Sequence, residues 1–229
     1  MRTAIQFFVA LALVAIVSRA FFVMGLIAPI VVQGSSMAPA LMGPHVAPTC
    51  SRCGWVSHIG TDQLPAGGWV TCSKCAGLLK LDELPVAPGD TMWVDRTAFL
   101  LRGPRRWDVV VFQCPNDATQ LCVKRVVGLP GERVAFRDGE VLINDRLVTK
   151  PVAVDYYLRP GDGMGQAGFD PRQQCWQLGE GYFVAGDNQE VSFDSRNWQS
   201  GPNLPAKLLV GRPTGHLRSG TEPKGHSVP

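Results

Sequence analysis

The N-terminal segment of the chain is a long apolar run. Residues 5–32 read IQFFVALALVAIVSRAFFVMGLIAPIVV, and Ser18 and Arg19 are the main interruption. A helix that crosses a bilayer needs about 20 mostly apolar residues, whereas a cleaved signal peptide has a shorter apolar core followed by small residues at its cleavage site. Because no convincing Ala-x-Ala site follows the run, we predict an uncleaved transmembrane anchor over residues 1–28. Arg2 favours a cytoplasmic N-terminus, with the rest of the chain outside.

Beyond the anchor, the sequence consists of short β-rich runs bounded by Gly, Pro, Asn or Asp, as expected for strands joined by turns. Such runs are TMWV at 91–94, DVVVF at 108–112, CVKRVV at 122–127 and YFVA at 182–185. No segment here keeps the apolar period of a helix. We therefore predict a mainly β protein, a sandwich or partly open barrel, built from residues 29–42 and 88–212. A polar tail over residues 213–229 is predicted to be disordered.

The composition excludes two broad classes of protein. With 45% hydrophobic and 18% charged residues, the chain is not globally disordered. Its net charge is only +3, and Lys and Arg are scattered along the sequence, without the basic stripe of a nucleic-acid-binding protein. We expect no nucleic-acid partner.

Two CxxC pairs lie in a Pro- and Gly-rich segment, residues 43–87, which we interpret as an inserted module. The pairs are Cys50 with Cys53 and Cys72 with Cys75. Two such pairs supply four thiolates to one tetrahedral metal ion, and a site with four protein ligands is closed and therefore structural. We predict structural zinc in a zinc-ribbon-like module with a peripheral role, such as docking or stability. Two disulfides are the alternative, because the module is predicted to lie outside the cytoplasm.

The β-rich domain contains three further cysteines. Cys114 and Cys122 flank a short loop, PNDATQL, between two predicted strands. A hairpin can bring them into disulfide range, but their spacing alone does not show it. Cys175 is left over, and we expect it to be a buried thiol.

The segment after the apolar run, QGSSMAPAL, contains two adjacent serines. A serine hydroxyl becomes a good nucleophile only when a neighbouring base takes its proton. The four histidines all lie in the cysteine module or the tail: His45, His58, His216 and His226. Lys124, between apolar residues of a predicted strand, is the remaining candidate base if burial lowers its pKa from about 10.4 towards about 7. From the residues alone, an exposed strand lysine is the commoner interpretation.

Five motifs, in this order, resemble the bacterial type I signal peptidases, the membrane-anchored Ser/Lys proteases. They are QGSSMAPAL, GDTMWVDR, RWDVVVF, VKRVVGLPGE and GDNQEVSFDSR. The resemblance runs from Pro29 to about Arg212, with the cysteine module between the first two motifs. It implies an all-β signal-peptidase-like domain and a serine endopeptidase that needs no catalytic cofactor. Such an enzyme removes signal peptides from exported proteins after small residues at the first and third positions before the cleaved bond.

The resemblance also implies roles for individual residues. Ser36 is the nucleophile, and Ser35 is a neighbour whose side chain should be dispensable. Lys124 is the general base, and Ser192 orients it through a hydrogen bond.

Further residues around the site are assigned by the same resemblance. Asp194 and Arg196 form a structural pair that holds the last motif. The oxyanion donors are the Ser36 N–H and a group at Gly34, where glycine leaves only backbone or water to replace the serine hydroxyl of other members. The substrate pockets are lined by four apolar residues: Ile30, Val32, Leu41 and Val123.

We therefore expect an inner-membrane enzyme with its catalytic domain on the outer face. Its partners would be signal peptides and membrane lipid, with the translocation machinery as a further candidate. Two alternatives stay open. One is a specialised processing peptidase of the same clan that serves a secretion or conjugation system. The other is a non-catalytic, membrane-tethered zinc-ribbon binding protein.

Overall fold

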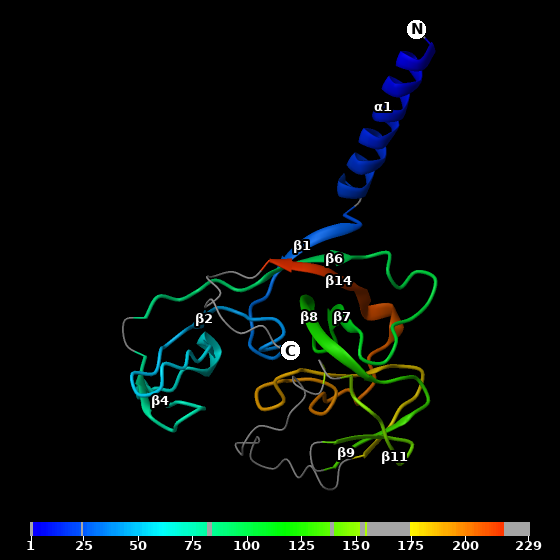
Figure 1. Ribbon diagram of the computed structural model, residues 1–229. Helices are drawn as coiled ribbons and strands as arrows, with labels where there is room; N and C mark the ends of the chain where they lie inside the picture. Colours follow the sequence, from blue (N-terminus) through cyan, green and yellow to red (C-terminus); the bar gives the residue numbers. More distant parts are fainter. Residues whose placement is uncertain are drawn as a thin grey trace.

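An N-terminal helix projects from a β-rich body (Figure 1). The computed structural model describes residues 2–23, 25–81, 84–137, 140–151, 154 and 175–217. Helix α1 spans Arg2–Val23 and is followed closely by strand β1, Ile27–Val31. Among the described residues, no helix is both long enough and apolar enough to cross a membrane. The predicted transmembrane anchor over residues 1–28 is therefore not supported.

The body is built on a six-stranded antiparallel sheet with the strand order β1-β6-β14-β7-β8-β13. Besides β1, its strands are β6 (Thr91–Asp95), β7 (Val109–Cys114), β8 (Asp117–Gly128), β13 (Phe183–Ala185) and β14 (Leu209–Leu217). Alternation is clear in β6, where Met92 and Val94 are fully buried and Trp93 faces outward. Strand β1 lies at one edge of this sheet, next to β6.

A second, four-stranded sheet has the order β11-β10-β9-β12. Its strands are β9 (Arg133–Arg137), β10 (Glu140–Ile143), β11 (Arg146–Leu147) and β12 (Cys175–Gln177). The two sheets share an apolar core in which Val127 and Phe183 of the first sheet pack with Val134, Phe136 and Val141 of the second. The prediction of a mainly β protein is confirmed.

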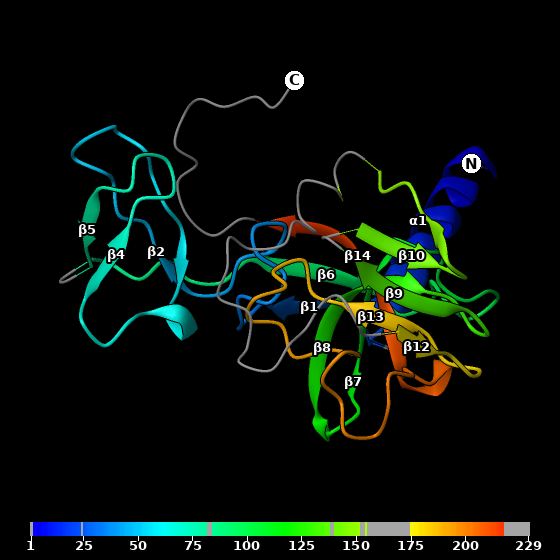
Figure 2. The same cartoon turned by 90° about the horizontal axis from the view of Figure 1, so that it is seen from below.

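The cysteine module lies between β1 and β6 in the chain and to one side of the body (Figures 1 and 2). It contains β2 (His45–Val46), β3 (Ile59–Gly60), the short 3-10 helix η1 (Thr61–Gln63), β4 (Trp69–Thr71) and β5 (Leu78–Lys80). Where the module joins the body, the Met42 N–H donates to an Asp90 carboxylate oxygen at 2.8 Å, and the Asp90 N–H donates to the Met42 carbonyl at 2.8 Å. The two ends of the insertion are therefore held side by side.

The C-terminal part of the described chain corrects the predicted disordered tail. After the 3-10 helix η2 (Ala206–Leu208), strand β14 continues to Leu217 and pairs with β6, so residues 213–217 are ordered. A register shift between Pro213 and Gly215 accommodates a proline that has no N–H for the strand ladder. The prediction for residues 218–229 lies outside the described residues.

Candidate active site

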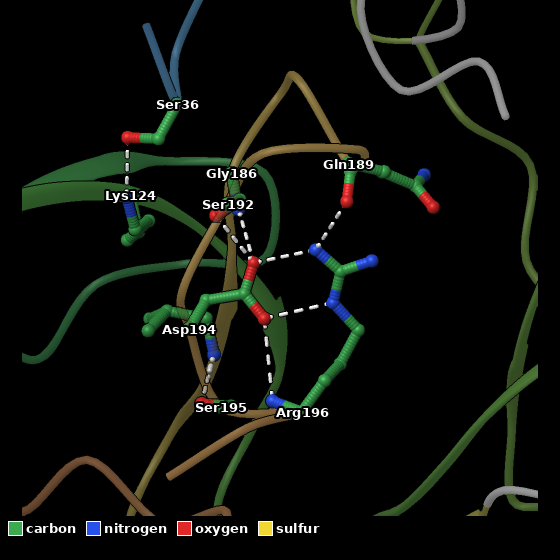
Figure 3. Close-up of polar contacts among 9 residues, drawn as sticks. Ser36, Lys124, Gly186, Gln189, Ser192, Asp194, Ser195 and Arg196 are labelled. Carbon is green, nitrogen blue, oxygen red and sulfur yellow. Dashed lines mark hydrogen bonds and ion pairs between the residues drawn. The ribbon is translucent and has the colours of Figure 1, made fainter. Parts of the chain in front are cut away.

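Ser36 lies on a tight turn shortly after β1. The Ala38 N–H donates to the Ser35 carbonyl at 3.1 Å, which closes a β-turn with Ser36 and Met37 at its centre. The Met37 side chain is buried in the core, and the Asn188 N–H donates to the Ser36 carbonyl at 3.0 Å. The turn is thus held on two sides and directs the Ser36 hydroxyl towards Lys124 (Figure 3).

Lys124 reaches this hydroxyl from β8, where it lies opposite Val110 of β7. Its Nζ donates to Ser36 Oγ at 2.5 Å (Figure 3), and the residue is only 5% exposed. Burial lowers the pKa of Lys124 to about 8, although the nearby carboxylate of Asp194 opposes this shift. A lysine with such a pKa has about a tenth of its side chains in the neutral, basic form at pH 7.

Asp194 is a fully buried carboxylate that organises the loop after β13. It forms an ion pair with Arg196 at 2.7 Å, and it accepts hydrogen bonds from the Gly186 N–H at 2.9 Å and from the Ser192 hydroxyl at 2.6 Å (Figure 3). The expected hydrogen bond from Ser192 to Lys124 is thus replaced by one to Asp194. The physical reason is that a buried carboxylate is a strong acceptor for the single hydroxyl proton.

Ser192 nevertheless lies beside the nucleophile turn. A Cβ atom placed on Gly186 would collide with both Ser192 Oγ and the Ser36 carbonyl oxygen. Only glycine allows the two segments to approach this closely.

A second buried ion pair was missed by the sequence reasoning. Arg125, the neighbour of the lysine, donates to both carboxylate oxygens of Asp187 at 2.8 and 2.7 Å and to the Trp107 carbonyl at 2.9 Å. The motif GDNQE contains Asp187, but no local pattern indicates its partner 62 residues away. Because Asn188 contacts Ser36, this pair ties β8 to the segment that holds the nucleophile.

The residues implied as substrate pockets come together in one apolar cluster with Met37 and Met92. They are Ile30, Val32, Leu41 and Val123. Gly34 lies exposed beside the turn. Within the described residues, no hydrogen-bond acceptor is found for the Ser36 N–H.

The comparisons with known proteins decide the family. Residues 83–215, more than half of the chain, match the family described as signal peptidase, peptidase S26. The chain belongs to this signal peptidase family. The match includes Lys124 and Ser192 but not Ser36, which precedes the cysteine module in the chain.

Relatives of this family member occur in plants and bacteria. A probable thylakoidal processing peptidase 2 of Arabidopsis thaliana is 35% identical, covering 54% of this chain and 32% of the relative. A signal peptidase I of Pseudomonas fluorescens is 31% identical, covering 59% of this chain and 57% of the relative. The chain thus spans between about a third and somewhat over half of the length of these curated relatives.

Among solved structures, the crystal structure of a signal peptidase I from Enterococcus faecalis is 28% identical. It covers 49% of this chain and 98% of that chain, with a TM-score of 0.38.

The four cysteines of the module form one cluster. The ligand atoms of Cys50, Cys53, Cys72 and Cys75 all lie within 4.8 Å of one another. The Cys50 and Cys75 sulfurs are 3.6 Å apart, and those of Cys53 and Cys72 are 3.7 Å apart. A disulfide requires about 2.05 Å, so these are free thiols.

The two thiols of the first CxxC pair differ in pKa. The Cys53 N–H lowers the pKa of Cys50 to about 7. The Trp55 N–H acts on Cys53 in the same direction, but burial and the neighbouring sulfurs outweigh it and raise the pKa of Cys53 to about 12. Clustered thiolates repel one another, and a metal ion relieves this repulsion.

The other three cysteines lie in the body. Cys114 and Cys122 form a disulfide across the β7–β8 hairpin, with their Cα atoms 5.5 Å apart. Cys175 is exposed, so the prediction of a buried thiol is wrong. On β12, the neighbouring Trp176 packs against the core instead, and alternation turns Cys175 outward.

Proposed function

We propose that this signal peptidase is a serine endopeptidase that removes signal peptides from exported proteins, with Ser36 as nucleophile and Lys124 as general base. The observation that carries the proposal is the 2.5 Å contact between a buried lysine amine and the Ser36 hydroxyl. A non-catalytic binding protein has no use for a lysine held in this position.

Acylation follows from the contact. When Lys124 is neutral, its Nζ accepts the Ser36 hydroxyl proton while Oγ attacks the carbonyl carbon of the substrate. The Ser36 N–H would donate to the developing oxyanion, with backbone or water at Gly34 as a second donor. As the tetrahedral intermediate collapses, the Lys124 ammonium gives its proton to the leaving amine. The signal peptide remains attached to Ser36 as an ester.

Deacylation reverses these roles. Lys124, neutral again, takes a proton from a water molecule that attacks the ester, and it returns a proton to Ser36 Oγ. Asp194 and Arg196 hold the loop after β13, which contacts the nucleophile turn through Asn188. Ser192 belongs to this loop. The role of Ser192 is therefore positioning, through Asp194.

Substrate selection rests on the apolar cluster next to the turn. Pockets lined by Ile30, Val32, Leu41 and Val123 would accept small side chains and reject large ones by steric clash. Among the described strands, β1 pairs on one side only, with β6, so an extended substrate would bind beside it as an added strand.

The test is cleavage of a precursor with alanine at the first and third positions before the cleaved bond. Wild-type protein should cleave it, while Ser36→Ala and Lys124→Ala should lose at least about 10³-fold in rate. Matched controls are Ser200→Ala and Lys207→Ala, which remove an exposed serine and an exposed lysine.

Each result has a defined meaning. Cleavage by folded Ser36→Ala or Lys124→Ala protein would rule out the proposed dyad. Cleavage of only a few precursors in a panel would favour the specialised processing peptidase. No cleavage of any precursor by wild-type protein would favour the binding protein.

We also propose that α1 attaches the enzyme to the outer face of the cytoplasmic membrane, where exported precursors emerge. The large apolar side chains of α1 are exposed, including Phe7 at 66% and Phe8 at 68%, and exposed apolar surface of this kind binds lipid or another partner. In vesicle flotation, the full chain should co-float, and the double variant Phe8→Glu/Val14→Glu should not. Leu147→Glu, which adds a charge at an exposed position of β11, is the control, and equal flotation of all three proteins would contradict the proposal.

We propose structural zinc for the four-cysteine cluster. In a tetrahedral site with zinc–sulfur bonds of about 2.3 Å, neighbouring sulfurs lie about 3.8 Å apart. The observed separations of 3.6 and 3.7 Å fit this geometry. Purified protein should contain about one zinc per chain, released by a thiol-specific reagent. A chain free of metal, with two disulfides in the module, would refute the proposal.

A further inference from the structure

The cysteine module contacts the nucleophile turn directly. The Ser35 N–H donates to Asp62 Oδ2 at 3.0 Å, and the Ser35 hydroxyl donates to Asp62 Oδ1 at 2.5 Å. Asp62 lies in η1, on the long loop between the two CxxC pairs. One carboxylate of the module thus binds both donor groups of the residue that precedes Ser36.

The contact belongs to a closely fitted interface. Ser35 is only 1% exposed. Gly60 is buried, and a Cβ atom there would collide with Ser35 Oγ. A Cβ atom on Gly34 would lie 3.8 Å from Asp62 Oδ2, so the module also borders the proposed oxyanion position. Glycine at position 60 therefore allows the module to lie this close to Ser35.

Asp62 contacts the turn at Ser35, the residue whose carbonyl closes the turn. Ser35 accepts the hydrogen bond that closes the turn, and Ser36 is the next residue. The Met37 side chain and the Asn188 N–H hold Ser36 from the body. The segment before Ser36 is held by the carboxylate of the module.

The position of Asp62 is in turn set by the module. Strand β3 pairs with β2, and the Thr61 N–H donates to the Pro44 carbonyl at 2.9 Å. The CxxC pairs lie on either side of this segment in the chain. The β2–β3 pair and this hydrogen bond therefore hold η1, and with it Asp62, next to Ser35.

We infer that Asp62 is a positioning residue for the nucleophile, acting through Ser35, and that it links the cysteine module to catalysis. This inference rests on the proposed peptidase function. It replaces two expectations from the sequence, a purely peripheral module and a dispensable Ser35 side chain. Asp62 itself is exposed, so water can replace its carboxylate when it is removed, and the variant should still fold with its turn less well held.

The kinetic test uses Asp62→Ala in the full chain. A misplaced nucleophile slows the chemical step, so kcat for precursor cleavage should fall about 10- to 100-fold, while KM stays within about twofold. Asp62→Asn, which keeps one acceptor oxygen, should recover part of the loss. The Asp62→Ala/Ser35→Ala double variant should lose less than the product of the two single effects, because both remove the same contact. Gln63→Ala, in the same 3-10 helix, is the matched control.

A second measurement does not depend on activity. Hydrogen–deuterium exchange over residues 32–41 should quicken in Asp62→Ala but not in Gln63→Ala, with unchanged zinc content in both. If exchange there matches wild type, or if the two variants have equal kcat, Asp62 does not position the nucleophile. If wild-type protein cleaves no precursor, the proposed function fails, and the exchange measurement still decides whether Asp62 holds the turn.

Discussion

Replacing Lys124 by methionine should make the protein more stable and catalytically inactive. Methionine keeps the length of the apolar stem but removes an ammonium group that is held away from water. Burial lowers the pKa of Lys124 from 10.5 to about 8, a difference of about 2.5, which corresponds to about 3 kcal/mol at pH 7. Loss of the hydrogen bond to Ser36 lowers the free energy of unfolding of the variant by about 1 kcal/mol. The expected net gain at pH 7 is about 2 kcal/mol.

The gain must depend on pH in a defined way. Below about pH 8, Lys124 is protonated in the folded and the unfolded chain, so the wild type carries the full cost of the buried charge. Between about pH 8 and 10.5, the unfolded chain binds more protons at this position than the folded chain. Wild-type stability therefore rises relative to Lys124→Met across this window, and the advantage of the variant disappears near its upper end.

Urea unfolding followed by tryptophan fluorescence at pH 7 and at pH 10.5 measures both quantities. Lys207→Met, at an exposed position, is the control and should change the free energy of unfolding by less than about 0.5 kcal/mol. A Lys124→Met protein that is no more stable than wild type at pH 7 would refute the argument. So would a gain that stays constant between the two pH values.

Three further outcomes are expected. The rate of precursor cleavage should rise with pH, with a midpoint at about pH 8, because only neutral Lys124 accepts the serine proton. In initial-rate assays, cleavage should be about tenfold faster at pH 9 than at pH 7. Arg125→Met should lower the free energy of unfolding by about 3–5 kcal/mol in urea titrations, because it leaves Asp187, which is 1% exposed, without its buried partner. Removing the proposed zinc with a chelator should slow cleavage by wild-type protein but have little further effect on Asp62→Ala, because a module that loses its fold no longer presents Asp62 to Ser35.

Each of these outcomes has a contrary result. A flat rate between pH 6 and pH 9 would show that a depressed lysine pKa does not control cleavage. Arg133→Met, at an exposed ion pair, is the control for Arg125→Met, and equal destabilisation of the two would contradict the importance of burial. Equal slowing of wild type and Asp62→Ala by the chelator would show that the module acts by a different route.

The features that could be predicted from the sequence are those that depend on short stretches of neighbouring residues. Alternating apolar runs indicated a mainly β body, and the CxxC spacing indicated a four-cysteine cluster. Lys124 was a candidate because no histidine lies in the predicted β-rich domain, and its role as the base for Ser36, 88 residues away, was implied by the resemblance of the motifs to a known family. These patterns do not require knowledge of which segments meet in space.

The features that could not be predicted depend on long-range contacts. Nothing near Asp62 or Asp187 in the sequence indicates that one meets Ser35 and the other Arg125. Ser192 was expected to donate a hydrogen bond to Lys124, because the sequence does not show that the buried Asp194 carboxylate accepts the Ser192 hydroxyl proton instead. In the same way, the sequence did not show that β14 pairs with β6 and continues past Pro213. Hydrogen bonding to a neighbouring strand keeps these residues ordered despite their polar, Pro-rich composition.

The cysteines of the body and of the module are in different oxidation states. Cys114 and Cys122 are oxidised to a disulfide, whereas the four module cysteines are free thiols. In the proposed location, both groups meet the same oxidants, which attack thiolates but react poorly with sulfur bound to a metal. If the module binds the proposed zinc, maturation depends on the order of events. A chain that takes up its metal first keeps the module intact, while a chain that is oxidised first traps it in wrong disulfides. The metal supply during export should thus set the yield of functional enzyme.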